Sequence, residues 1–300
     1  MVGMLPKLRV GDPIRHEALS VFPLFWESKS TIEYRISDEA LADQSVVVEE
    51  VSEGGSVPDL VVENRGDVRV LFLEGEQLIG AKQNRILNTS VLIGAHTKVK
   101  IPVSCVEQGR WRYTARHFSS SGSHAQGSLR HALKKSVSMS VSTTGGHSSD
   151  QGAIWHEVAC LQAFHDVKSE TGALSDAFEQ HQGVIESYRE KLKYPANASG
   201  MAVAIGPRVT CIDVFDKPST CEKVWNRLLS GYVFAVLGEK FDNYATAADV
   251  ERLLASASEF QWQLSPAVGE GQEFRAESAD GYASALQFDG ATIHGNVLVA

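Results

Sequence analysis

Short apolar runs separated by turn residues characterise the first 115 positions of the chain. The runs are rich in β-branched and aromatic residues, a composition that predicts strands. The predicted strands span residues 21–26, 45–51, 60–64, 68–74, 84–93 and 98–104. Closely spaced antiparallel strands of this kind are typical of an antiparallel sandwich or an open barrel.

Residues 117–149 have a different composition, with eleven serines and few large apolar side chains. Such a segment buries too little apolar surface to offset the conformational entropy that it loses on ordering. We therefore expect a flexible insert, either a mobile loop or a flap, with room for a short helix around residues 129–135.

Helical spacing of apolar residues appears after position 150 and is followed by strand patterns. The patterns predict helices over residues 154–164 and 178–192, and strands over residues 201–205 and 208–214. The C-terminal half is therefore mixed in secondary structure.

Capping and turn signals define the remaining elements. Ser219 with Glu222, and Thr246 with Asp249, have the spacing of a capping box and predict two helix starts. Asp289-Gly290 predicts the turn of a C-terminal β-hairpin. The predicted fold class is α+β, with a β-rich region 1–116, the insert 117–149 and a mixed region 150–300. The last region forms either its own core or one continuous core with the first.

Length and composition limit the class of protein. A chain of 300 residues with 43% hydrophobic content can bury a sizeable core without metals or disulfides. The four cysteines are far apart and form no CxxC pair, which is typical of a reduced, cytoplasmic protein. Because no segment has the apolar length of a signal peptide or a membrane span, we expect a cytoplasmic protein without membrane contact.

The net charge of −9 conceals a strongly basic segment. Residues 77–149 contain ten basic residues and one acidic residue, Glu107, so the segment carries +9 and the rest of the chain −18. A basic zone in an acidic protein favours a small phosphorylated ligand over a nucleic-acid polymer, which the overall field would repel. The alternative is that these charges pair with the acidic remainder.

The sequence contains no established catalytic motif. We find no GxxxxGK[ST] phosphate loop, no GxSxG elbow and no HExxH zinc motif. His156 and Cys160 stand four residues apart, but such pairs on a helix are usually accidental, so no metal site is predicted. The sequence identifies no cofactor.

Polar and charged residues concentrate between positions 74 and 111, among apolar strand segments. Carboxylates there are suited to general-base chemistry, and the basic, amide and aromatic side chains to contacts with phosphate, ribose and base. The candidate catalytic residues are Glu74, Glu76 and Glu107. The candidate ligand-binding residues are Lys82, Gln83, Asn84, Arg85, Arg110 and Trp111.

Arg85 is the most informative of these residues. With a period of two, it shares the more apolar face of its predicted strand with Leu87. A charge at the end of a core-facing row needs an anionic partner, because a buried unpaired charge is very costly. That partner is either a protein carboxylate (Glu74, Glu76 or Glu107) or a ligand phosphate, which the planar guanidinium binds through two oxygens.

Two further residues have both a chemical and a structural interpretation. Cys105 lies near Arg110, which could activate its thiol, but it shares a face with Ile101 and Val103. We therefore interpret Cys105 as a small core residue. Trp111 either stacks on a ligand base or packs at the rim of the core.

Five long motifs are similar to those of a known family. In chain order they are EVSEGGSVPDL, VENRGD, EGEQLIGAKQNRILNTS, IPVSCVEQGRW and FSSSGSHA. Through them the chain resembles the ARG and rhodanese-phosphatase-associated protein family, from about Val21 to Ala173 and more weakly to the C-terminus. The family is named for its genomic association with ADP-ribosylglycohydrolases and rhodanese–phosphatase proteins. The resemblance therefore implies processing or sensing of ADP-ribose or another NAD-derived nucleotide, and it assigns no catalytic residues.

These observations lead to two hypotheses of different classes. The first is binding or processing of an ADP-ribose-like or other NAD-derived phosphorylated nucleotide. Lys82 and Arg85 are then expected to contact phosphate, and Trp111 the base, while Gln83 or Asn84 contacts ribose hydroxyls. The second is a non-catalytic interaction module that docks a partner enzyme of ADP-ribose or NAD metabolism.

Overall fold

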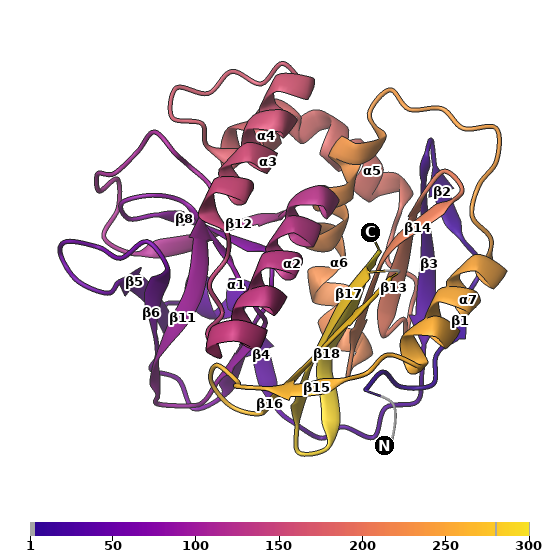
Figure 1. Cartoon of the computed structure of the whole chain (residues 1–300), viewed down its shortest axis with the longest axis horizontal. Helices are drawn as coiled ribbons and strands as arrows, with labels where there is room; N and C mark the ends of the chain where they lie inside the picture. Colours follow the sequence, from indigo (N-terminus) through magenta and orange to yellow (C-terminus); the bar gives the residue numbers. More distant parts are fainter. Residues whose placement is uncertain (1–3, 280, 300) are drawn as a thin grey trace. The chain divides into compact units, whose positions relative to one another are not determined.

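The structure, a computed structural model, describes residues 4–279 and 281–299. The chain forms two compact units from segments that are far apart in the sequence (Figure 1). Unit 1 comprises the residues up to Thr31, Gly183–Ser265 and the residues from Gln272 onwards, and unit 2 comprises Ile32–Gln182 and Pro266–Gly271. The predicted insert 117–149 therefore lies inside unit 2. The predicted regions 1–116 and 150–300 extend to residues 1–3, 280 and 300, which lie outside the described residues.

The fold is α+β with a β-rich N-terminal half, as predicted. Unit 1 contains one nine-stranded antiparallel sheet in the order β1-β3-β13-β14-β18-β17-β16-β15, with β2 paired to β3. Its strands are β1 (Arg9–Val10), β2 (Ile14–His16), β3 (Leu19–Phe25), β13 (Gly200–Ile205), β14 (Arg208–Phe215), β15 (Gln263–Ser265), β16 (Gln272–Ser278), β17 (Gly281–Phe288) and β18 (Ala291–Val299). Its helices are α5 (Gln182–Lys191), α6 (Pro218–Val233), the 3-10 turn η1 (Phe234–Val236) and α7 (Ala247–Ser258).

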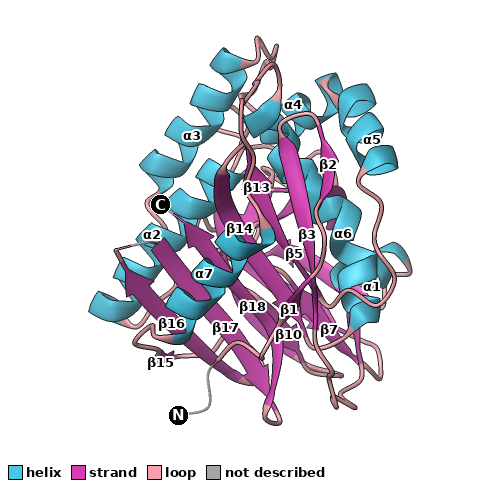
Figure 2. Ribbon diagram, turned by 90° about the vertical axis from the view of Figure 1, so that its right-hand side faces the viewer, coloured by secondary structure: helices cyan, strands magenta, loops and turns pink. Residues whose placement is uncertain are grey.

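Alternation along the strands builds the core of unit 1. Phe22 and Ile212 project from neighbouring parts of the sheet into one apolar cluster, which Val250 of α7 completes. Figure 2 shows α7 lying over the strands of this sheet. The predicted hairpin is confirmed, because Asp289 and Gly290 both have positive φ between β17 and β18.

The two predicted capping boxes have different outcomes. Thr246 and Asp249 form a capping box at the start of α7. The prediction for Ser219 and Glu222 is wrong, since α6 begins one residue earlier, at Pro218. Proline suits the first helical position because its missing N–H would have no intrahelical partner there.

Unit 2 contains two sheets and four helices. The six-stranded antiparallel sheet has the order β12-β8-β9-β11-β6-β5, and the three-stranded sheet the order β10-β7-β4, with β4 parallel to β7. The strands are β4 (Tyr34–Ile36), β5 (Val46–Glu50), β6 (Asp59–Asn64), β7 (Arg69–Phe72), β8 (Glu76–Gly80), β9 (Arg85–Leu87), β10 (Val91–Ile93), β11 (Lys98–Cys105) and β12 (Phe118–His124). The helices are α1 (Ser37–Ala42), α2 (Gly127–Thr144), α3 (Gln151–Phe164) and α4 (Leu174–Gln180).

A single apolar core joins the two sheets of unit 2. Val48, Leu60 and Leu87 contribute from the six-stranded sheet, and Phe72 and Val91 from the three-stranded sheet. Two sheets that share a core in this way form a sandwich-like arrangement.

The predicted strand 84–93 is two strands in the structure. Asn88 interrupts it, since its buried side chain donates to the carbonyl oxygen of His147 (2.8 Å) and accepts from Ser104 Oγ (2.5 Å). Asn88 is therefore held by side-chain bonds, and the chain turns between β9 and β10. Likewise, the predicted helix 178–192 is divided into α4 and α5 at His181.

Residues 117–149, for which the composition predicts a mobile segment, form β12 and the 18-residue helix α2. Leu129, Leu133 and Val137 recur every four residues and are fully buried, so α2 has an apolar stripe despite its many serines. Between them Lys134 is also fully buried and lies 2.6 Å from Glu74. The helix is therefore anchored by both apolar packing and a buried ion pair.

No helix within the described residues has the length and apolarity needed to cross a bilayer.

The packing of α2 leads to a prediction about stability. Leu133→Ala is expected to lower the free energy of unfolding of the protein by about 2–5 kcal/mol, because it removes buried methyl groups and leaves a cavity. Met139→Ala, on the exposed side of the same helix, is expected to change it by less than about 0.5 kcal/mol. Urea denaturation measures both values, and equal values for the two variants would contradict a packed helix α2.

Candidate functional site

The candidate site residues between positions 74 and 111 all lie in unit 2, on β8 and β9, in the loops before and after β8, and in the loop after β11. They do not form one cluster. The structure divides them into a network around Arg110, a centre around Arg85 and an ion pair at Glu74.

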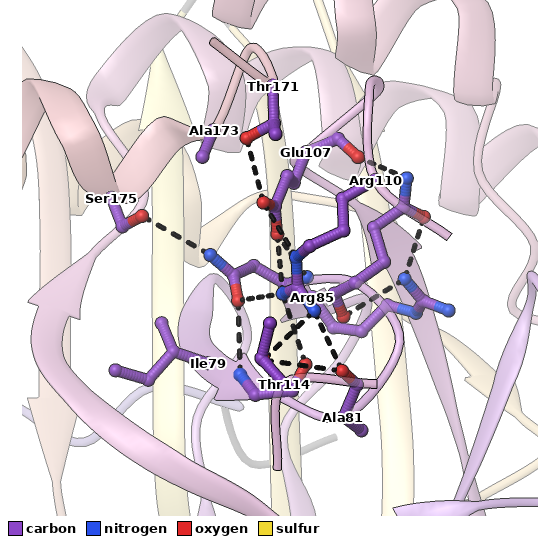
Figure 3. A network of polar contacts seen from close by, with 12 residues as sticks. Ile79, Ala81, Arg85, Glu107, Arg110, Thr114, Thr171, Ala173 and Ser175 are labelled. Carbon is purple, nitrogen blue, oxygen red and sulfur yellow. Dashed lines mark hydrogen bonds and ion pairs between the residues drawn. The ribbon is translucent and has the colours of Figure 1, made fainter. Parts of the chain in front are cut away.

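Arg110 is the hub of the first network (Figure 3). Its Nε and Nη2 donate to the two carboxylate oxygens of Glu107 at 2.8 and 2.6 Å. Nη1 donates to the carbonyl oxygen of Ala81 (2.7 Å), and Nη2 also donates to Asn84 Oδ1 (3.0 Å). Bonds to the Arg112 carbonyl (3.0 Å) and other groups complete the set. Protein acceptors therefore engage every nitrogen of this guanidinium.

Glu107 is equally well bonded. Besides Arg110, it accepts from the backbone N–H of Asn84 (3.1 Å) and from Thr171 Oγ1 (2.8 Å). Burial by itself would raise the pKa of Glu107, but these hydrogen bonds outweigh burial and hold the pKa below its ordinary value. A carboxylate stabilised in its ionised form is a weak proton acceptor, so its position favours an anchoring role over general-base chemistry.

Asn84 and Gln83 connect this network to its surroundings. Asn84 Nδ2 donates to Ser175 Oγ (3.2 Å), and Gln83 Nε2 donates to the carbonyl oxygen of Glu107. Gln83 Oε1 in turn accepts from Arg85 Nη1 at 2.8 Å. The two amide side chains therefore link Arg85 to the Arg110 network.

Arg85 forms a more open centre than Arg110. Its side chain is fully buried, yet Nε and Nη2 have no hydrogen-bond partner among the described residues. The nearest carboxylate is Glu50, whose Oε1 lies 3.6 Å from Nη2, beyond hydrogen-bonding distance. Burial lowers the pKa of Arg85, and the nearby Cys105 and Glu50 oppose that shift. Arg85 therefore has an anionic neighbour, but two of its donors remain unused.

Glu50 is not among the carboxylate partners predicted for Arg85, which are Glu74, Glu76 and Glu107. The sequence does contain a signal, because Glu50 is in phase with the core residues Val46 and Val48 on β5. Its side chain is 2% exposed, at the end of that inward-facing row.

Aromatic side chains surround the Arg85 centre. The guanidinium carbon of Arg85 lies 5.4 Å from the ring centroid of Trp111, and Lys82 Nζ lies 5.6 Å from the same ring. Both distances are within the range of cation–π attraction. Lys82 Nζ is also 5.1 Å from the ring of Tyr113. Trp111 is 46% exposed, so one part of its ring meets solvent while another part lies near Arg85.

Cys105 is a core residue, as the alternation predicts. It pairs with Arg85 in the register of β11 and β9, and it is 1% exposed. Burial raises the pKa of its thiol to about 11, an effect that Arg85 opposes. A thiol that stays protonated at neutral pH is a poor nucleophile.

Glu74 and Glu76 flank Gly75, which has a φ of +79° at the turn between β7 and β8. Glu76 accepts from Ser37 Oγ and from the backbone N–H of Leu73 (3.0 Å). Glu74 Oε2 lies 2.6 Å from Lys134 Nζ, and both side chains are fully buried. Unlike the carboxylate of Glu107, that of Glu74 has one close charged neighbour and no further partner for its oxygens among the described residues.

The basic segment contains both paired and less constrained charges. Arg110 and Lys134 form close ion pairs with glutamates, as the structural alternative for these charges requires. Lys82 contacts aromatic rings instead. Within the described part of the chain, no group of three or more His, Cys, Asp or Glu side chains is arranged to hold a metal ion.

A profile of the ARG and Rhodanese-Phosphatase-superfamily-associated Protein domain matches residues 7–298. The chain belongs to this family. The match covers both units, including the C-terminal strands for which the sequence motifs gave the weaker resemblance. No curated protein and no solved structure matches the chain significantly. Family membership therefore indicates an association with other protein superfamilies and assigns no roles to individual residues. Those roles follow from the geometry.

The Arg110 network leads to a pH-dependent prediction. Glu107→Gln is expected to lower the free energy of unfolding by about 3 kcal/mol at neutral pH, because it leaves Arg110 buried with a neutral partner. The folded-state pKa of Glu107 is lowered, so its stabilisation is complete above the ordinary glutamate pKa of about 4.3. The difference between wild type and variant is expected to shrink as the pH falls through the lowered pKa.

Urea denaturation at a series of pH values measures this difference. Glu179→Gln, at an exposed position of α4 in the same unit, is the matched control and is expected to leave the unfolding midpoint unchanged. A loss of stability in Glu107→Gln that does not depend on pH would contradict the assigned ion pair.

Proposed function

We propose that this protein binds a small phosphorylated nucleotide of the ADP-ribose type at the Arg85 centre of unit 2. The observation that carries the proposal is the fully buried guanidinium of Arg85, whose Nε and Nη2 have no hydrogen-bond partner among the described residues. Buried donors are almost always satisfied in folded proteins, and a guanidinium edge with two free N–H groups matches two oxygens of a phosphate.

Neighbouring side chains supply the other contacts that such a ligand needs. Lys82 adds a second positive charge, and the half-exposed ring of Trp111 offers a face on which a base can stack. Gln83 already bonds Arg85 and orients it. Asn84 and Arg110, also predicted as ligand contacts, support the site from the adjoining network, since both are engaged by protein groups.

The ligand reaches Arg85 when the ring of Trp111 moves away from the guanidinium, and the same ring then stacks on the base. Residues 51–58 and 111–117, on either side of the Trp111 ring, contain no helix or extended strand. Gly55 in the first loop approaches Trp111 so closely that a Cβ atom would lie 2.9 Å from the ring. Loops without regular secondary structure rearrange at lower free-energy cost than strands, so closure of these loops over the ligand is part of the proposal.

Two further observations support this ligand class. The basic segment places positive charge in an otherwise acidic chain. The family description refers to association with ARG and the rhodanese-phosphatase superfamily, a setting consistent with ADP-ribose chemistry. The proposal is one of binding: of the predicted general bases, Glu107 already accepts four hydrogen bonds, and Glu74 forms a buried ion pair outside the Arg85 centre. Glu76 accepts hydrogen bonds from Ser37 and Leu73.

Ligand stabilisation tests the proposal. ADP-ribose at about 100 times its dissociation constant is expected to add about 2.7 kcal/mol to the stability of the folded protein and to raise Tm by several degrees. Arg85→Ala is expected to abolish the shift. Arg85→Lys, which keeps a charge beside Glu50, is expected to weaken affinity about tenfold or more, because an ammonium cannot bind two phosphate oxygens in a plane.

Arg65→Lys serves as the matched control, since Arg65 is an exposed arginine of the same unit that pairs with Glu63. It is expected to retain the full shift. Equal shifts in wild type and both Arg85 variants would place the ligand elsewhere. Absence of a shift with ADP-ribose, NAD, AMP and ribose phosphates would refute nucleotide binding and favour the interaction module, which a pull-down of encoded neighbours would then examine.

A further inference from the structure

A cavity of about 740 Å³ opens beside the Arg85 centre in unit 2. The residues that line it differ in charge: they include Glu49, Glu50 and Glu53, which are acidic, together with Tyr113 and the basic Arg116. A volume of this size accommodates a nucleotide-sized group.

Glu50 distinguishes this cavity from an ordinary acidic surface. The residue is more than nine-tenths buried, and neither Oε1 nor Oε2 has a hydrogen-bond partner among the described residues. A buried carboxylate without hydrogen bonds is unfavourable by several kcal/mol unless something satisfies it. Its nearest cation, Arg85, is 3.6 Å away. Glu50 therefore has two unused acceptor atoms that lie beneath the wall of the cavity, and the movement of residues 51–58 in the proposed function gives a ligand access to them.

The charged groups around the cavity favour different parts of a ligand. Carboxylates repel phosphate and accept hydrogen bonds from hydroxyl groups. The unused donors of Arg85 and the ammonium of Lys82 instead attract phosphate and donate hydrogen bonds to it. A molecule that carries hydroxyls a few bonds from a phosphate satisfies both sets of groups at once, and a ribose phosphate has this arrangement.

We propose that Glu50 binds the 2′- and 3′-hydroxyls of the ligand's adenosine ribose, each of which donates to one carboxylate oxygen. The inference rests on the proposed nucleotide function and adds a specificity-determining residue to it. A glutamate performs this task in dinucleotide-binding folds of unrelated topology, where it accepts from ribose hydroxyls. With Arg85 on the phosphate and Trp111 on the base, Glu50 makes the site selective for ribonucleotides.

Binding of AMP and two analogues by titration calorimetry tests this inference. Wild-type protein is expected to bind 2′-deoxy-AMP about tenfold and 2′,3′-dideoxy-AMP up to about a hundredfold more weakly than AMP, because each lost hydroxyl leaves a carboxylate oxygen unsatisfied. Glu50→Gln is expected to bind AMP about tenfold more weakly and to discriminate less between the three ligands. Glu63→Gln, on the neighbouring strand β6 and paired with exposed Arg65, is expected to behave as wild type.

The outcomes separate the two proposals. Equal affinities of wild-type protein for AMP and its deoxy analogues, with binding still dependent on Arg85, would overturn the role of Glu50 and leave nucleotide binding intact. Absence of binding of both AMP and ADP-ribose to the wild type would overturn both. The analogue series uses wild-type protein, so the test remains decisive if Glu50→Gln fails to fold.

Discussion

The pairing of buried charges is the constraint on which the structure of unit 2 depends. The segment 77–149 contributes four buried basic side chains, Arg85, Arg110, Arg130 and Lys134, and ion pairs with glutamates involve Arg85, Arg110 and Lys134. The pairs are Arg85–Glu50, Arg110–Glu107 and Lys134–Glu74. An unpaired charge at any of these positions would cost several kcal/mol, so strands and loops must take positions that bring each pair together. The pairs thereby help to hold residues 107–110 and helix α2 in place.

The three pairs differ in how many of their donors and acceptors have hydrogen-bond partners. That difference underlies our distinction between a structural pair and a candidate binding pair. Arg110 and Glu107 form a saturated network in which every nitrogen of the guanidinium is bonded. Arg85 and Glu50 are further apart and retain unused donors and acceptors beside a cavity. Because folded proteins leave few buried polar groups unsatisfied, we assign the proposed ligand to the Arg85–Glu50 pair. A saturated network next to it holds Gln83 and thus the orientation of Arg85.

The same reasoning explains why a serine-rich segment is ordered. Composition describes the whole of residues 117–149, whereas stability depends on the few side chains that are buried. In α2 these are an apolar stripe that includes Leu129 and Leu133, together with Arg130 and Lys134. Serine is tolerated on the other faces, because serine at an exposed helix position lowers helix stability by only a few tenths of a kcal/mol relative to alanine.

The sequence by itself determined the α+β class, most of the long strands, the C-terminal hairpin and the start of α7. These depend on local signals: period-two alternation, turn residues and capping spacing. It also determined that Arg85 faces the core and must be paired, and that Cys105 is structural. Only the tertiary structure decided which carboxylate meets which cation. Glu50 reaches Arg85 across the sheet order β5-β6-β11-β9, and Glu74 reaches Lys134 on a helix 60 residues later in the chain. Alternation identifies the inward face of each strand, but partners on different strands and helices are set by sheet order and packing, which no local pattern in the sequence encodes.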